Sequence, residues 1–149
     1  MASETSTVRA VALDLGADRA DALGMLRPDQ RRPELLVLYG DPNSIVRLRE
    51  LLEDQGAQLD AAKDLAEMRA AFFSRGGHDV LILTPDLPVQ IAERAARALR
   101  DLDRDVAIVA FGRELTRAKL PESATRLPEF HPTSRAGIGA ILRVFAANR

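Results

Sequence analysis

The sequence contains no cysteine and only two histidines, His78 and His131. The absence of cysteine excludes disulfide bonds, thiolate catalysis and cysteine-ligated metal sites. Two histidines are too few for a histidine-rich metal site. Aromatic residues make up only 4% of the 149 residues, so the core has to be built from aliphatic side chains. We therefore expect no metal and no other cofactor, and we do not expect an enzyme.

The chain also lacks a strong net charge and long hydrophobic segments. Its formal charge of −1 at pH 7 provides no general attraction for nucleic acids or anionic lipids. No apolar run approaches the roughly 18 residues of a membrane-spanning helix, and Met1–Arg9 contains no hydrophobic signal core. We expect a cytoplasmic protein that binds neither nucleic acid nor membranes.

The composition and length fit a single globular domain with an extension. Apolar residues account for 46% of the chain and charged residues for 29%. A polar stretch bracketed by Pro28 and Pro33 has the character of a linker. We expect residues 1–32 to form an N-terminal extension or arm, with an added strand and a short helix as one option. Residues 33–149 then form the domain proper.

From Leu35 onward, strand patterns and helix patterns alternate. Strands are predicted at Leu35–Tyr39, Ala57–Ala61, Val80–Leu83, Val106–Phe111 and Ala124–Leu127. Helices are predicted at Asn43–Asp54, between Asp64 and Arg75, at Val89–Leu102, at Glu114–Lys119 and from Thr133 or Ser134 onward. Alternating elements joined by short loops predict a parallel sheet with helices on both faces.

Several residues mark helix ends and buried faces. Asn43 is the expected N-cap of the first helix, and Gly56 is placed to end it. Asp64 and Glu67 have the spacing of a capping box at the start of the second helix, and Gly76 and Gly77 are expected to end it. Its apolar face is expected to contain Leu65, Met68 and Phe72, with Phe73 as a further candidate. The third helix carries arginines interleaved with acidic residues, which favours a solvated face.

Four local segments occur in a consistent order along the chain. The first loop and helix contain the segments Asp41–Asn43 and Arg49–Gly56. The second strand ends in the segment Ala61–Asp64. Asp79–Pro88 contains the third strand and its loop, and His131-Pro132 precedes the last helix. This series resembles the receiver domain of bacterial response regulators. The resemblance implies a flavodoxin-like (CheY-like) α/β sandwich with five parallel strands, here with an N-terminal extension.

In that family an aspartate after the third strand takes up a phosphoryl group, and an acidic pair after the first strand holds Mg²⁺. A Thr or Ser after the fourth strand and a Lys after the fifth contact the phosphoryl oxygens. This sequence departs from the pattern at every position. The acidic pair falls on Tyr39 and Gly40, the nucleophile on Thr84, the Thr or Ser on Phe111, and the Lys on His131. A shift of one residue would place Gly112, instead of Phe111, at the position of the Thr or Ser.

The resemblance therefore predicts a degenerate pocket, as in a pseudo-receiver. Asp41 and Asp86 lie in the adjacent loops, but one loop carboxylate from each side makes a poor site for a hard cation. The Thr84 hydroxyl is a weak nucleophile unless a base activates it, and no base is evident nearby in the sequence. We expect aspartyl phosphorylation at the usual position to be lost.

By resemblance, such a domain acts in bacterial signal transduction by recognising a protein partner, with a second copy of itself as one candidate. The family's commonest contact face maps to Glu114–Lys119, Ala124–Leu127 and Ser134–Phe145. The expected interaction residues are Leu115, Lys119, Leu127, Phe130, Ile138, Ile141 and Phe145. Two alternatives remain open. A small ligand or nucleotide could occupy the vacated pocket, although no glycine-rich phosphate loop supports this. Phosphorylation at a shifted residue such as Asp86 is the other.

Overall fold

A computed structural model describes residues 31–148, so the predicted extension lies outside the described residues except for Arg31 and Arg32. Within this range one parallel sheet has the strand order β2-β1-β3-β4-β5. Its strands are β1 (Glu34–Leu38), β2 (Gln58–Ala62), β3 (Val80–Leu83), β4 (Ala107–Phe111) and β5 (Thr125–Leu127). The helices are α2 (Pro42–Asp54), α3 (Leu65–Arg75), α4 (Val89–Leu102), α5 (Arg113–Thr116) and α6 (Arg135–Ala147). This topology confirms the predicted flavodoxin-like fold.

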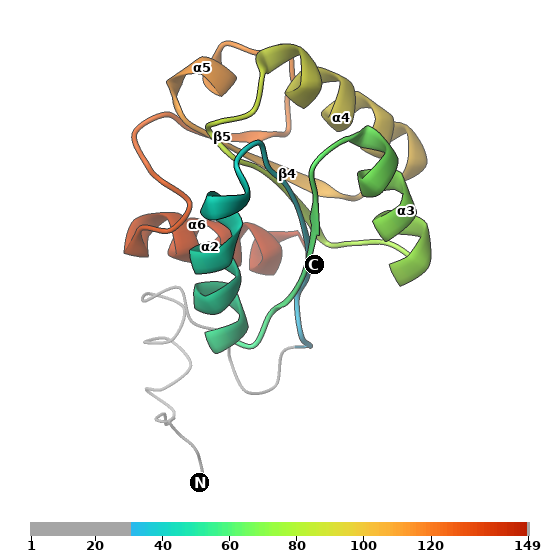
Figure 1. The fold of residues 1–149 in the computed structure, drawn as a ribbon. Helices are drawn as coiled ribbons and strands as arrows, with labels where there is room; N and C mark the ends of the chain where they lie inside the picture. The colour runs from blue at the N-terminus through green and yellow to red at the C-terminus, as the bar shows by residue number, and fades with distance from the viewer. Residues whose placement is uncertain (1–30, 149) are drawn as a thin grey trace, which may run out of the picture.

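Helices cover both faces of the sheet (Figure 1). On one face α3, α4 and α5 enclose a core that includes Met68, Phe72 and Leu99. On the other face α2 and α6 enclose a second core, with Leu48 and Phe145 among its largest side chains. All four side chains of β3 are buried, because this central strand contributes to both cores. No helix of residues 31–148 is long and apolar enough to cross a membrane.

Most element boundaries agree with the sequence patterns. β3 and α4 begin and end at the predicted residues, and the ends of the other strands differ by at most one residue. The short helix predicted at Glu114–Lys119 is present as α5, but its bounds are wrong, because α5 starts at Arg113 and stops at Thr116. The backbone carbonyls of Thr116 and Ala118 accept hydrogen bonds from the Arg126 guanidinium, at 2.8 and 2.9 Å. A side chain from β5 therefore occupies acceptors that a longer helix would use.

The helix caps show one error and two confirmed expectations. The N-cap of α2 is Asp41, not Asn43, and its carboxylate accepts the Asn43 N–H at 3.0 Å. Pro42 at the first helical position explains the shift, since proline needs no N–H partner there. Asp64 caps α3 by accepting the Glu67 N–H, as predicted. Gly76 ends α3 in the left-handed conformation, with φ of +81°.

Phe73 does not belong to the apolar face of α3. Its side chain is 65% exposed, whereas Phe72 is 8% exposed and packs in the core. Consecutive helical residues point about 100° apart, so only one of the two rings faces the sheet. Phe73 instead packs its ring edge-on against Phe72, at a centroid distance of 5.6 Å.

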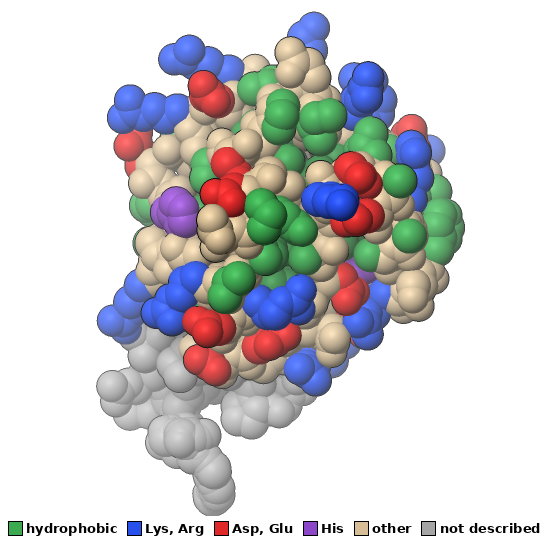
Figure 2. Space-filling view, in the orientation of Figure 1, with side chains coloured by type: hydrophobic (Ala, Val, Ile, Leu, Met, Phe, Trp, Pro, Cys, Tyr) green, Lys and Arg blue, Asp and Glu red, His purple; other side chains and the backbone are tan. Residues whose placement is uncertain are grey.

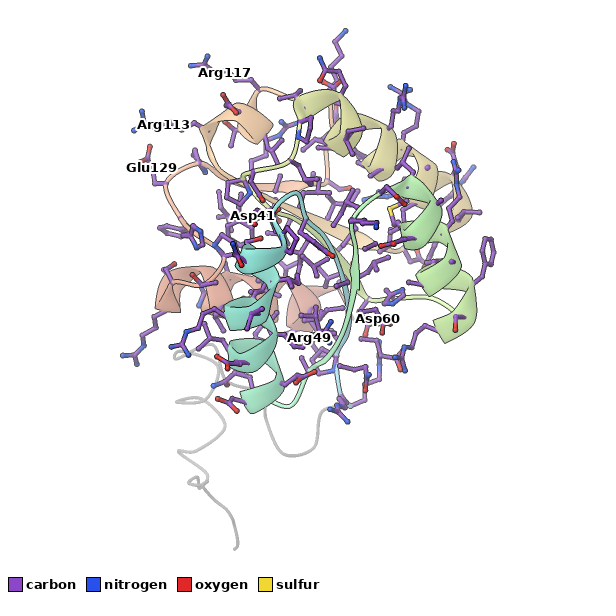
Figure 3. The ribbon with its side chains drawn as sticks, in the orientation of Figure 1. Asp41, Arg49, Asp60, Arg113, Arg117 and Glu129 are labelled. Atoms are coloured by element: carbon purple, nitrogen blue, oxygen red, sulfur yellow. The ribbon has the colours of Figure 1, made fainter. Side chains whose placement is uncertain are left out.

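Asp60 in β2 is the centre of a polar cluster at the sheet edge (Figure 3). Its carboxylate accepts two hydrogen bonds from Arg75, both of 3.0 Å, and one from His78 Nε2 at 2.8 Å. The Arg75 bond, followed by that from His78, holds the pKa of Asp60 below its usual value of 3.8. His78 is only 5% exposed, so Asp60 satisfies a buried donor.

We expect Asp60→Asn to lower the free energy of unfolding by about 1–3 kcal/mol near neutral pH, because a buried imidazole loses its charged acceptor. The folded-state pKa of Asp60 lies below the unfolded one. Its contribution is therefore present above about pH 4 and is lost as the pH falls through the folded value. Urea unfolding at neutral and at acidic pH measures both effects. Asp105→Asn, at an exposed position, is the matched control. Equal stability of the two variants would contradict the role of the cluster.

Candidate functional site

The carboxyl ends of the three central strands form the candidate site. The register pairs Leu38 with Leu83, and Leu83 with Ala110. Tyr39, Thr84 and Phe111 follow these residues, and they therefore lie in one row at the same edge of the sheet. Ligands of parallel α/β sheets bind at this edge. The structure thus brings together the positions that the receiver resemblance singled out.

Asp86 connects the two loops that meet at this edge. One oxygen of its carboxylate accepts a hydrogen bond from the Thr84 hydroxyl, and the other accepts the backbone N–H of Asp41. The Thr84 hydroxyl also lies 3.4 Å from the Leu38 carbonyl, and Thr84 is completely buried. No base near Thr84 was evident from the sequence, whereas the structure places the Asp86 carboxylate beside its hydroxyl. The buried hydroxyl acts as a link between β3, β1 and Asp86.

Two glycines allow the loops at this edge to pack closely. A Cβ atom on Gly40 would lie 2.8 Å from the carbonyl oxygen of Asp86. Gly112 follows β4 with φ of +92°, and a Cβ there would lie 2.7 Å from Cβ of Pro85. Real Cβ atoms do not approach so closely, so both positions require glycine. The loops after β1, β3 and β4 are therefore in direct contact.

Asp41 and Asp86 both use their polar groups within the loops. Asp41 caps α2 through Oδ1, and Asp86 accepts hydrogen bonds on both oxygens. Within residues 31–148 no three or more His, Asp or Glu side chains cluster closely enough to hold a metal ion. The two carboxylates thus stabilise loop structure, as helix cap and as inter-loop link.

The other predicted pocket residues lie apart from this network. Phe111 is completely buried and packs in the core beneath α2 and α6, so it forms no wall of a pocket. Tyr39 is half-buried, and its backbone N–H donates to the Ala62 carbonyl at 3.1 Å. His131 is exposed, and its Nδ1 accepts the Thr133 N–H at 3.2 Å.

Most of the expected interaction residues are not on the surface. Leu115, Ile141 and Phe145 are completely buried, and Ile138 is 9% exposed. These apolar side chains occupy the inward face of their helices, because the sheet has to be covered. Lys119 and Phe130 are exposed, and Leu127 is half-buried. These four residues are therefore not available to a partner, and the interaction face stays a prediction for Lys119, Leu127 and Phe130.

The exposed surface around α5 and β5 is held by polar contacts. Arg126 donates to three carbonyls, of Thr116, Ala118 and Leu120. Glu93 of α4 accepts the Lys119 N–H at 2.7 Å. At the margin of this surface Arg113 and Glu129 form an exposed ion pair of 3.3 Å (Figure 3). These contacts fix α5 although it is only one turn long.

Charged side chains of both signs are interspersed on the face of the molecule in Figure 2. No continuous basic area covers that face. Together with the formal charge of −1, this mixed pattern gives that face no field suited to a polyanion.

No protein-family model and no curated protein matches the sequence. Solved structures do match. The chemotaxis response regulator CheY4 of Vibrio cholerae is 19% identical with a TM-score of 0.57, over 76% of this chain and 99% of CheY4. The response regulator PhyR from Brucella abortus is 12% identical with a TM-score of 0.63, over 88% of this chain and 53% of PhyR. A chain of the complex of histidine kinase ThkA with response regulator TrrA is 25% identical with a TM-score of 0.50, over 64% of this chain and 83% of that chain.

We expect Gly112→Ala to lower the free energy of unfolding by about 2–5 kcal/mol. A left-handed backbone costs a non-glycine residue about 1–2 kcal/mol, and the overlap with Pro85 adds about 1–3 kcal/mol. Gly77→Ala is the matched control, because Gly77 has φ of +110° with no atom within 4 Å of the added Cβ. Thermal or urea unfolding of both variants separates the cost of the left-handed backbone from the cost of the overlap with Pro85. Equal losses would disprove the close packing of the loops.

Proposed function

Because the described part of this chain has the receiver-domain fold, we propose that it is a pseudo-receiver. It recognises a protein partner in bacterial, cytoplasmic signal transduction without being phosphorylated. The proposal is supported by the replacement of every phosphorylation residue at the strand ends. Thr84, at the position of the nucleophilic aspartate, is completely buried and already hydrogen-bonded.

The Asp86 carboxylate is the observation that carries this proposal. In the family, a phosphoryl group at this edge binds a hydroxyl group and thereby relays its presence. Here a carboxylate encoded in the sequence accepts the Thr84 hydroxyl and the Asp41 N–H. The two loops are therefore joined without any modification. Gly40 packs closely on Asp86, and Gly112 packs closely on Pro85. The loops are therefore in direct contact, which disfavours the binding of a small ligand between them.

The surface that binds the partner is proposed to lie around α5 and β5. Its exposed apolar group is Phe130, which is 39% exposed, beside the half-buried Leu127. Arg126 and Glu93 hold α5 in place, so little conformational entropy is lost when a partner binds. The structures similar to this one include a response regulator in complex with a histidine kinase. A second copy of this chain is the partner that can be tested first.

We expect no phosphoryl group to be added when the protein is incubated with a small phosphodonor and Mg²⁺. The hydroxyl at the nucleophile position is buried, and a hydroxyl is a weaker nucleophile than a carboxylate at neutral pH. Intact mass spectrometry measures the product, with an active receiver domain in the same reaction as the positive control. A mass increase that Asp86→Asn abolishes would show phosphorylation at a shifted residue and would refute the proposal.

We expect the protein to dimerise at high concentration and Phe130→Ser to weaken the dimer. Removing an exposed phenyl ring at the interface costs apolar burial, and a loss of at least tenfold in affinity is expected. Analytical ultracentrifugation over a concentration series measures it. Phe73→Ser is the matched control, since Phe73 is an exposed phenylalanine on α3, which packs on β1 and β2 rather than on β5. A wild-type protein that stays monomeric throughout would exclude the dimer and leave another protein as the partner.

A further inference from the structure

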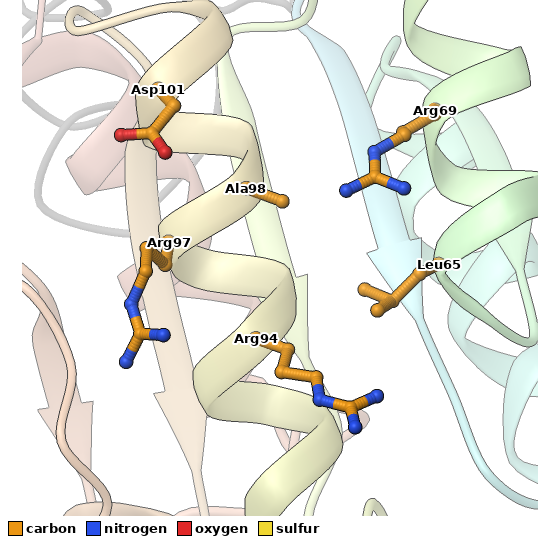
Figure 4. Close-up of a pocket in the computed structure, with 6 residues that line it drawn as sticks. All are labelled: Leu65, Arg69, Arg94, Arg97, Ala98 and Asp101. Atoms are coloured by element: carbon orange, nitrogen blue, oxygen red, sulfur yellow. The ribbon is translucent and has the colours of Figure 1, made fainter.

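A groove between α3 and α4 combines an apolar floor with arginines. Its volume is about 240 Å³. In Figure 4, Leu65 and Arg69 extend from α3 toward α4, and Arg94 and Ala98 extend from α4 toward α3. Arg97 and Asp101 complete the lining from α4. The groove lies in the helix layer of α3 and α4, and none of its lining residues belongs to the loops after β1, β3 and β4.

The three arginines of the groove are not neutralised by neighbouring carboxylates. In residues 31–148 no ion pair within 4.0 Å involves Arg69, Arg94 or Arg97. Other arginines of this chain do pair, such as Arg75 with Asp60 and Arg113 with Glu129. The interleaved acidic residues of α4 predicted a solvated face, and Arg94 and Arg97 are indeed exposed without forming ion pairs to them. Three arginines against one aspartate leave the lining with a formal charge of +2.

Each of the two helices carries an exposed apolar side chain four residues after a residue that lines the groove. Phe73 lies one helical turn beyond Arg69 on α3, and Leu102 lies one turn beyond Ala98 on α4. They are 65% and 42% exposed. Exposed large apolar groups beside a charged groove are typical of a surface that binds a partner.

We propose that this groove binds an acidic segment of a partner protein, with carboxylates on Arg69 and Arg94 and apolar side chains on Leu65, Ala98 and Phe73. A guanidinium presents paired N–H donors that match the two oxygens of a carboxylate, and its flat face packs on apolar groups. An acidic segment with interspersed apolar residues satisfies both features of the groove. This surface is independent of Phe130 and of the proposed α5 and β5 contact.

The size and charge of the groove favour a peptide over other anions. Pockets for small molecules usually measure about 300–1,000 Å³, so a volume of about 240 Å³ suits one or two side chains. A nucleic acid needs an extended basic surface, whereas Asp101 lines this groove and the chain has a net charge of −1. The local charge of the groove is enough for a few carboxylates.

The test uses the full chain and a short labelled peptide of glutamate and leucine, with fluorescence anisotropy as the readout. The matched peptide with glutamine for glutamate, and a single-stranded DNA oligonucleotide of equal charge, are the comparison probes. We expect the glutamate peptide to bind, the glutamine peptide to bind at least tenfold more weakly, and added salt to weaken binding. Stronger binding of the oligonucleotide, or equal binding of the two peptides, would overturn the proposal.

Charge-reversal variants locate the binding. Arg69→Glu and Arg94→Glu should each weaken binding at least tenfold. Arg117→Glu, an equal charge change at the exposed arginine directly after α5 (Figure 3), should change it less than twofold. Arg69 and Arg94 are exposed, so we expect their variants to stay folded. Circular dichroism of Arg69→Gln and Arg94→Gln checks this. Equal loss with Arg117→Glu would mean unspecific attraction and refute the site.

Substitutions of the exposed phenylalanines separate this groove from the surface around α5. Phe73→Ser should weaken peptide binding, whereas Phe130→Ser should leave it unchanged. The reverse result would assign the peptide to the α5 surface and overturn the groove proposal. Self-association that is lost in Arg94→Glu but kept in Phe130→Ser would identify a second copy as the occupant and would also overturn it.

Discussion

A parallel sheet exposes no face to water, and the central strand β3 sets this constraint here, because all four of its side chains are buried. Its side chains point alternately into two separate cores, one beneath α3 and α4 and the other beneath α2 and α6. Every helix except the one-turn α5 therefore has to lie flat on the sheet. The carboxyl ends of β1, β3 and β4 are left as the place where loops meet, and the helix surfaces are left for partners.

The loops at the strand ends are in direct contact with each other. Asp86 accepts hydrogen bonds from Thr84 and Asp41, and Gly40 lets the backbone of one loop approach the other. Under the proposed function this edge holds no phosphorylation switch, and the output depends on whether a partner is present.

Continuous patterns in the sequence were sufficient for the fold. The apolar run Val80–Leu83 and the helical spacing of Val89–Leu102 each identified an element to the residue, since burial and turn signals agree there. Gly76 ended α3 as expected because its left-handed conformation is a local property. The Asp41 cap could have been found too, since an acidic residue directly before a proline is a common helix start.

The candidate site depended on side-chain directions that no pattern encodes. Nothing in the sequence tells whether Asp86 turns toward Thr84 or toward water, and the shortening of α5 depends on Arg126, ten residues away from Thr116. The interaction residues were misassigned because resemblance names elements, whereas burial decides which face of α6 is free. Arg69 and Arg94 line the same groove, and this proximity likewise follows only from the packing of α3 on α4.

The contact between Thr84 and Asp86 also determines what would follow from placing a phosphate-accepting aspartate at position 84. Thr84→Asp would restore the nucleophile in name, but it would set a second carboxylate against Asp86 at a fully buried position. Two like charges so close cannot both ionise without cost, and one of them would keep its proton. An aspartate at position 84 therefore calls for a replacement of Asp86 as well.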